Sequence, residues 1–198
     1  MIPKNKTSIE VLVKEIKNLP KIESIAIYKS LLAQLEDVAF DGKDLQWMHF
    51  YYKAICWIRM GFIEESGSRK DVYFNKAEKL IEEGLKLSPK ESELYVLRAL
   101  MNQGKILVSV VARGMRYISD IESDLRKAKS LNPLNPRAYF LLGQSYLNKP
   151  SFIGGSKQIA LFNFKKAKEK FLAQEDNFHA FYPTWGNWQN EEELNKLL

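Results

Sequence analysis

Residues 121–146, IESDLRKAKSLNPLNPRAYFLLGQSY, contain the pattern that decides the fold. Ile121, Leu125 and Ala128 recur at spacings of four and three, which predicts the apolar face of an α-helix. The first proline of the stretch ends this helix. The second proline falls where the next helix makes its first turn, a position that tolerates proline. The stretch therefore predicts two successive helices joined by a short turn.

The same pattern recurs along the chain at regular distances. Small residues allow neighbouring helices to approach closely, and large residues fill the space between them. A self-similar pattern with a period of 20–50 residues is typical of a solenoid of stacked helix pairs. The matching positions are Ala77, Ile81, Gly84 and Pro89, which Ile121, Leu125, Ala128 and Pro133 follow 44 residues later, and then Ala160, Phe164 and Ala167, a further 39 residues along.

The first helix of each pair supports the same register. Tyr139, Gly143 and Tyr146 stand at alternating large and small positions, as the matching residues of the earlier helices mostly do. This pattern resembles the tetratricopeptide repeat (TPR), and the resemblance implies an all-α superhelix of antiparallel helix pairs. A standard TPR has about 34 residues, so these repeats would be extended. A period near 44 also suits HEAT-type repeats, but the prolines that end the helices favour the TPR.

A second resemblance covers residues of roughly 45 to 190. The chain is similar to a Bacteroidetes family of TPR-like proteins, and this resemblance implies no particular activity. Members of that family usually begin with an export signal. The matching pieces are His49–Ala54, Arg113–Tyr117, Leu131–Tyr139, Pro150–Gly155 and Pro183–Gly186.

We therefore predict one TPR-like helical domain over residues 1–198. Helices are expected at about 25–35, 44–63, 71–87, 91–110, 115–131, 136–148 and 157–173, with a shorter one near 12–19. The predicted units are an N-terminal helical pair (1–42), three repeats (43–89, 90–134 and 135–175) and a C-terminal cap (176–198).

The residues that usually carry catalysis or bind metals are scarce. Cys56 is the single cysteine, and the two histidines, His49 and His179, are not in a metal-binding spacing. The Gly154–Lys157 stretch lacks the order of a phosphate-binding loop. We predict a non-catalytic protein with no metal site and no cofactor.

The net charge of +6 is concentrated in one part of the chain. Residues 90–175 hold 15 basic and 7 acidic residues, whereas the last 23 residues are acidic. The lysines of 165–170 flank an apolar stripe and are expected to face water, without the stacking aromatics that nucleic-acid binding favours. The excess indicates an acidic partner, or the acidic tail folding back onto these lysines, rather than a nucleic acid.

The location of the protein is predicted from what its first residues lack. Residues 1–7 contain no apolar segment of a secretory signal, and no apolar run is long enough to span a membrane. The sequence as written predicts a cytoplasmic protein. A mature periplasmic or exported protein is the alternative.

The function we predict from the repeat is a scaffold that binds a protein or peptide. In such solenoids the first helices line a concave groove that holds extended ligands, and this groove would suit an acidic or amphipathic segment. Its predicted residues are Tyr51, Arg59, Glu93, Gln103, Arg137, Phe140, Gln144 and Asn148.

Two further hypotheses stay open. Arg113 and Arg116 lie three apart on one helical face, where they would form an anion clamp or else pair with carboxylates such as Asp120. The alternative function is a carrier of a small or lipid-like molecule. Its pocket would be lined by Trp47, Phe50, Tyr51 and Trp57. The sequence leaves the identity of the partner and the oligomeric state open.

Overall fold

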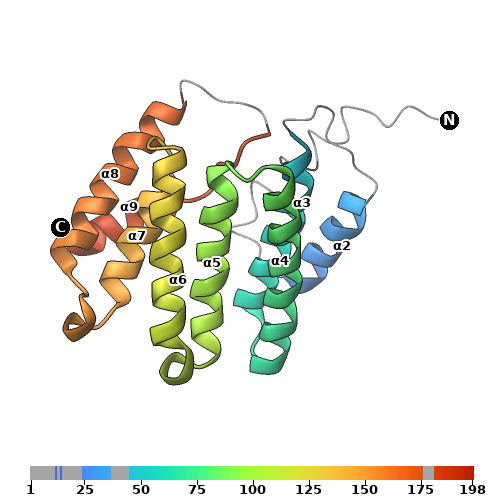
Figure 1. The fold of residues 1–198 in the computed structure, drawn as a ribbon, viewed down its shortest axis with the longest axis horizontal. Coiled ribbons are helices and arrows are strands. Elements are labelled where there is room, and N and C mark those ends of the chain that lie inside the picture. Colours follow the sequence, from blue (N-terminus) through green and yellow to red (C-terminus); the bar gives the residue numbers. More distant parts are fainter. Residues whose placement is uncertain (1–11, 13, 15–23, 37–44, 176–180) are drawn as a thin grey trace.

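A computed structural model describes residues 12, 14, 24–36, 45–175 and 181–198 (Figure 1). All regular elements in these residues are helices, which confirms the predicted all-α class. The elements are α2 (Ile25–Glu36), α3 (Gln46–Ile63), α4 (Gly67–Leu87), α5 (Ser92–Val108), α6 (Val110–Leu131), α7 (Pro136–Asn148), the 3₁₀ turn η3 (Ser151–Ile153), α8 (Lys157–Glu175) and α9 (Asn187–Leu197). The predicted helix near 12–19 lies almost entirely outside the described residues.

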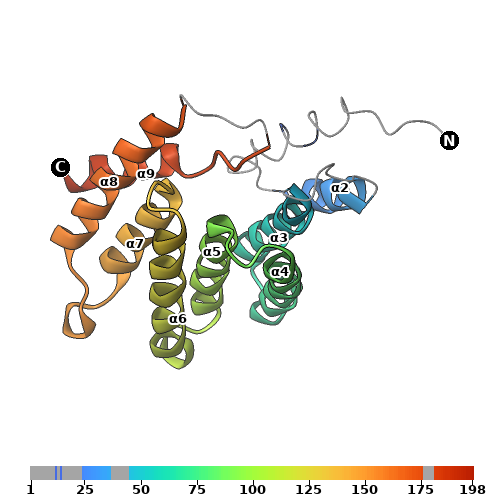
Figure 2. The ribbon, with the colours of Figure 1, turned by 45° about the horizontal axis from the view of Figure 1, so that its top comes forward.

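The long helices pack as consecutive pairs. α3 packs on α4, α5 on α6 and α7 on α8, and the pairs stand side by side in a row (Figures 1 and 2). The first helices of the pairs, α3, α5 and α7, also contact one another. α9 packs on α8 at the end of this row.

Glycines set the close spacing of these helices. A Cβ atom at Gly104 of α5 would lie 2.4 Å from the ring of Phe74, and one at Gly143 of α7 would lie 2.5 Å from the ring of Phe164. Real Cβ contacts are not that short. At both crossings a glycine therefore leaves room for one large aromatic side chain, and Gly143 is one of the small positions predicted from the repeat.

The turns between the pairs repeat in atomic detail. The hydroxyl of Tyr95 donates to the carbonyl of Pro89 over 2.9 Å, and that of Tyr139 donates to the carbonyl of Pro133 over 3.2 Å. The two contacts are 44 residues apart, which is the period of the sequence pattern. The tyrosine that opens each first helix thus ties that helix to the turn before it.

Two boundaries differ from the prediction. α6 begins at Val110 because the extended backbone of Ser109 already breaks the chain after α5. Gly114, which falls in the break predicted between residues 110 and 115, lies inside α6. The C-terminal segment also contains a helix, α9, that the sequence pattern did not indicate. No helix in the described residues is long and apolar enough to cross a membrane.

Candidate functional site: a pocket lined by the C-terminal segment

A pocket of about 420 Å³ lies where α3, α5, α6 and α7 meet the C-terminal segment. This volume falls within the range of about 300–1,000 Å³ typical of small-molecule sites. Its apolar walls are Phe62, Leu100, Ile106, Leu107, Val110, Ile118, Ile121, Phe140 and Trp185. Its polar lining includes Arg59, Gln103, Gln144, Ser145, Asn148, Lys149 and Gln189.

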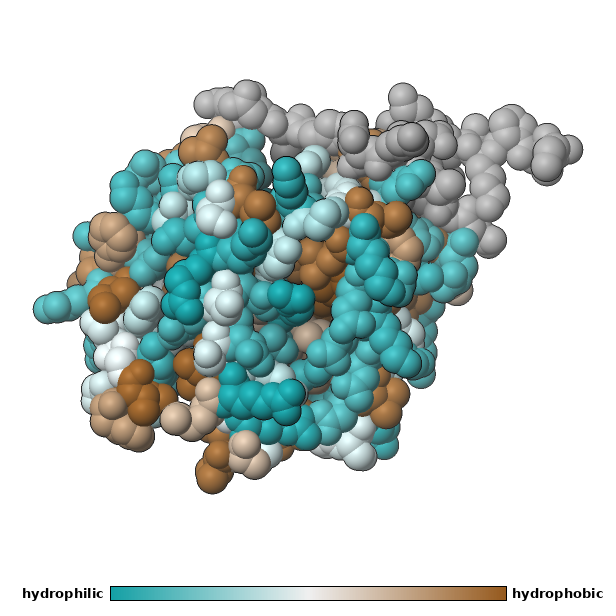
Figure 3. Space-filling model, in the orientation of Figure 1, coloured by the Kyte–Doolittle hydropathy of each residue, from teal (hydrophilic) through white to brown (hydrophobic). Residues whose placement is uncertain are grey.

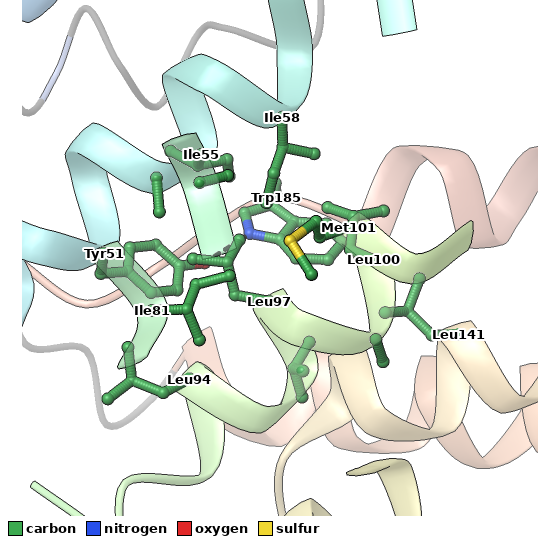
Figure 4. Packing of buried hydrophobic residues seen from close by; sticks show 14 of the residues in the cluster. Tyr51, Ile55, Ile58, Ile81, Leu94, Leu97, Leu100, Met101, Leu141 and Trp185 are labelled. Atoms are coloured by element: carbon green, nitrogen blue, oxygen red, sulfur yellow. Dashed lines mark hydrogen bonds between the residues drawn. The ribbon is translucent and has the colours of Figure 1, made fainter. Parts of the chain in front are cut away.

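Trp185 forms one wall because the C-terminal segment returns to α3 before it turns into α9 (Figure 2). The indole Nε1 donates to the hydroxyl of Tyr51 over 2.7 Å, and the ring lies among apolar side chains of α3 and α5 (Figure 4). Earlier in the segment, the ring of Tyr182 packs edge-on against Trp47 at 5.7 Å. These contacts hold Trp185 in one orientation.

A buried ion pair supports the same segment. Arg137 of α7 is fully buried and donates to both carboxylate oxygens of Glu93 on α5, at 2.6–3.0 Å. Its Nη1 also points to the carbonyl of Trp185, at 3.5 Å. Such a pair tolerates burial because each charge is compensated by the other. Arg137 and Glu93 therefore fasten α5, α7 and the C-terminal segment together.

Arg59 of α3 has a contrasting environment on the pocket wall. Its Nε is buried and finds no hydrogen-bond partner in the described structure, and no described acidic side chain pairs with its guanidinium. The centre of the guanidinium lies 5.9 Å from the ring of Trp185. Burial lowers the pKa of this group. A buried donor without a hydrogen-bond partner is costly, and an anion in the pocket would satisfy it.

The other cation in the lining is already neutralised. The ammonium of Lys149 pairs with the carboxylate of Glu122 on α6 and lies 4.6 Å from the ring of Tyr146. Gln189 is engaged as well, because its side chain accepts from the backbone N–H of Gly186 at the start of α9. Arg59 is thus the lining cation that remains available to a ligand.

The structure separates the predicted groove residues into two sets. The lining of the pocket contains Arg59, Gln103, Phe140, Gln144 and Asn148. The remaining three, Tyr51, Glu93 and Arg137, are buried behind the pocket and form the network that holds Trp185. Their side chains face other parts of the protein rather than an open surface.

The two arginines of the predicted anion clamp do not converge. Arg113 forms a bidentate pair with Asp71 of α4, at 2.6 and 2.8 Å. Arg116 is exposed and lies beside the ring of Tyr117. The pairing partner is Asp71, 42 residues away, rather than the nearby Asp120.

Several pocket residues were not identified from the sequence. The repeat register indicated only first helices, whereas α6 and the C-terminal segment supply much of the lining. The aromatic and glycine residues of 183–188 were a visible signal, but they indicated a terminal cap. The lining of this pocket contains none of Trp47, Phe50, Tyr51 and Trp57, the residues predicted for the carrier alternative.

Fold and site together define a class: an all-α protein of stacked helix pairs with an apolar pocket whose wall includes an arginine that pairs with no carboxylate of the described residues. The chain is similar in structure to the HusA haemophore from Porphyromonas gingivalis. The TM-score is 0.83 with 29% sequence identity, over 99% of this chain and 95% of that protein. No family model matches the sequence, and no curated protein matches it.

This similarity corrects the predicted function. A haemophore is a carrier that binds haem, a small molecule. This finding contradicts the prediction of a scaffold that binds a protein or peptide. It also contradicts the prediction that the partner is a protein or peptide. The finding supports the alternative, a carrier of a small molecule. HusA is a binding protein rather than an enzyme.

Proposed function

We propose that this protein is a haem carrier that holds a haem or a related porphyrin in the pocket beside Trp185. The observation that carries the proposal is Arg59, a partly buried cation on the wall of an apolar pocket whose buried Nε has no hydrogen-bond partner in the described residues. The similarity to the HusA haemophore supports the choice of ligand.

The chemistry of the lining suits a porphyrin. A porphyrin is a flat apolar ring with carboxylates at one edge. Trp185, Phe140 and Phe62 offer aromatic surface to such a ring. Arg59 is placed to receive one carboxylate through charge-assisted hydrogen bonds, which would compensate its buried charge.

The pocket recognises the ring rather than the iron. Haem iron is usually bound by His, Cys, Met or Tyr side chains, and none of these residue types is among the residues that line the pocket. Affinity then comes from the apolar walls and from Arg59. Binding should therefore not require the metal.

Comparative titration tests this proposal. Absorbance titrations with haem and with iron-free protoporphyrin should both saturate at one ligand per chain, with dissociation constants within about threefold of each other. If neither ligand saturates the protein, the proposal that it is a haem carrier is refuted. If haem binds more than about a hundredfold more tightly than protoporphyrin, the protein has a ligand for the iron, and the proposal that binding is independent of the metal is refuted.

We also infer that the helix pairs are extended TPR-type repeats, at 43–89, 90–134 and 135–175, within one domain. The duplicated Tyr-to-Pro contacts at a spacing of 44 residues support this assignment.

We place the working site of the protein outside the cytoplasm, as an exported protein. The similarity to the HusA haemophore supports this location. Fractionation of the native cell with an antibody against the chain tests the inference. Recovery solely in the cytoplasmic fraction would contradict it.

A further inference from the structure

Exposed apolar side chains gather at one end of the molecule. They come from the α5–α6 turn and from η3, which both lie at the lower end in Figures 1 and 3. Val111 is 96% exposed and Phe152 is 87% exposed. We call this surface the apolar tip, and it consists of Leu107, Val110, Val111, Met115 and Phe152.

The apolar tip adjoins the pocket. Leu107 and Val110 belong to both, because each lines the pocket and is more than half exposed. The connection from α7 to η3 also lines the pocket, through Lys149 and Pro150. The two turns that carry the tip therefore flank the same end of the pocket.

Basic side chains lie beside the apolar tip. The two segments that form it, residues 105–119 and 146–159, contain five basic residues and no acidic one. Three of the five pair with carboxylates from other elements. Arg116 and Lys157 are exposed, and neither pairs with a described carboxylate.

We propose that the apolar tip docks the protein on a bilayer surface rich in anionic phospholipids. Apolar side chains that project from turns enter the boundary between headgroups and acyl chains, and basic side chains beside them face the lipid phosphates. The described chain has no membrane-spanning helix, so this contact is peripheral. The docking does not depend on which ligand the pocket holds.

This placement has a consequence for an apolar ligand. With the tip against the bilayer, the adjoining end of the pocket faces the membrane rather than water. A poorly soluble molecule would then pass between pocket and bilayer without crossing the aqueous phase, where exposure of its apolar surface is unfavourable.

Vesicle co-sedimentation tests the docking with the full chain. The protein should sediment with vesicles of equal parts phosphatidylcholine and phosphatidylglycerol, and far less with phosphatidylcholine alone. Exchanging both apolar residues (Val111→Ser with Phe152→Ser) should lower the partition coefficient at least about tenfold. Exchanging both basic residues (Arg116→Gln with Lys157→Gln) should lower it about fivefold per charge and weaken its dependence on salt.

A control variant carries one exchange of each kind at the opposite end of the molecule. Leu134 is 69% exposed in the α6–α7 turn, and Lys127 is exposed on α6 nearby. Leu134→Ser with Lys127→Gln should bind vesicles as the wild type does. The proposal would be overturned if the protein did not sediment with the anionic vesicles. It would also be overturned if the control variant lost as much vesicle binding as the tip variants. Light scattering that shows a dimer abolished by the Val111 and Phe152 exchanges would also overturn it, in favour of a contact between two copies.

Discussion

Two arginines of the same interior have opposite environments, and the difference identifies the binding residue. Arg137 is fully buried and fully paired with Glu93. Arg59 is held against Trp185 with a buried Nε that nothing in the described chain satisfies. A buried charge that is paired holds parts of the structure together. An unpaired charge on a pocket wall indicates a site where a ligand of opposite charge can bind.

This contrast predicts different effects of the same substitution. Arg137→Met should destabilise the protein by about 3–5 kcal/mol, because it leaves the carboxylate of Glu93 buried without a partner. Arg59→Met should leave the free energy of unfolding within about 1 kcal/mol of the wild type, or raise it. Urea denaturation of both variants measures these energies. A large loss of stability in Arg59→Met would show that Arg59 has a structural partner.

The stability of the protein depends on pH through the carboxyl group of Glu91. It caps α5, receives a hydrogen bond from Tyr182 in the C-terminal segment, and burial raises its pKa from 4.5 to about 7. The folded state therefore binds this proton more tightly than the unfolded state does. The stabilisation is complete below about pH 4.5 and is lost as the pH rises towards 7 and above.

Glu91→Gln should remove this dependence while it keeps an oxygen to cap the helix. Relative to the wild type, the variant should be more stable by about 1–3 kcal/mol at a pH near 8, with the difference shrinking at a pH near 4. Urea denaturation at both pH values measures it. A difference that does not change with pH would contradict the raised pKa.

At the scale of the elements, glycines determine how closely the helices approach. Gly143→Ala should destabilise the protein by about 1–3 kcal/mol, because the new methyl group would collide with the ring of Phe164. Gly114 of α6 is the matched control, since a Cβ there has no neighbour within 4 Å. Gly114→Ala should stabilise by up to about 1 kcal/mol through helix propensity. Equal effects in thermal denaturation would contradict this account of the crossings.

The elements also show what a one-dimensional pattern can predict. The repeat predicted the helix pairs because each apolar stripe and each small residue acts within its own pair or on its neighbour. It misplaced the break before α6, because one residue, Ser109, is enough to interrupt the helices when its backbone is extended. α9 was not recognised because it is short and carries only two buried residues, Asn190 and Leu194.

At the scale of the whole molecule, the pocket depends on contacts that the sequence does not reveal. Tyr51 and Trp185 are joined across 134 residues. Arg137 looked like a groove residue because its position in the repeat faces inward, yet Glu93 pairs with it there. Arg59 was among the predicted binding residues, but its lack of a partner becomes visible only when the surrounding residues are in place.

Haem titration of two matched variants tests whether Arg59 binds the carboxylate of a porphyrin in this pocket. Arg59→Met removes the pocket cation, and Arg126→Met removes an exposed arginine of α6. Loss of a charge-assisted hydrogen bond predicts haem affinity about 10–100-fold lower in Arg59→Met and unchanged in Arg126→Met. Equal affinity in both variants and the wild type would contradict the claim.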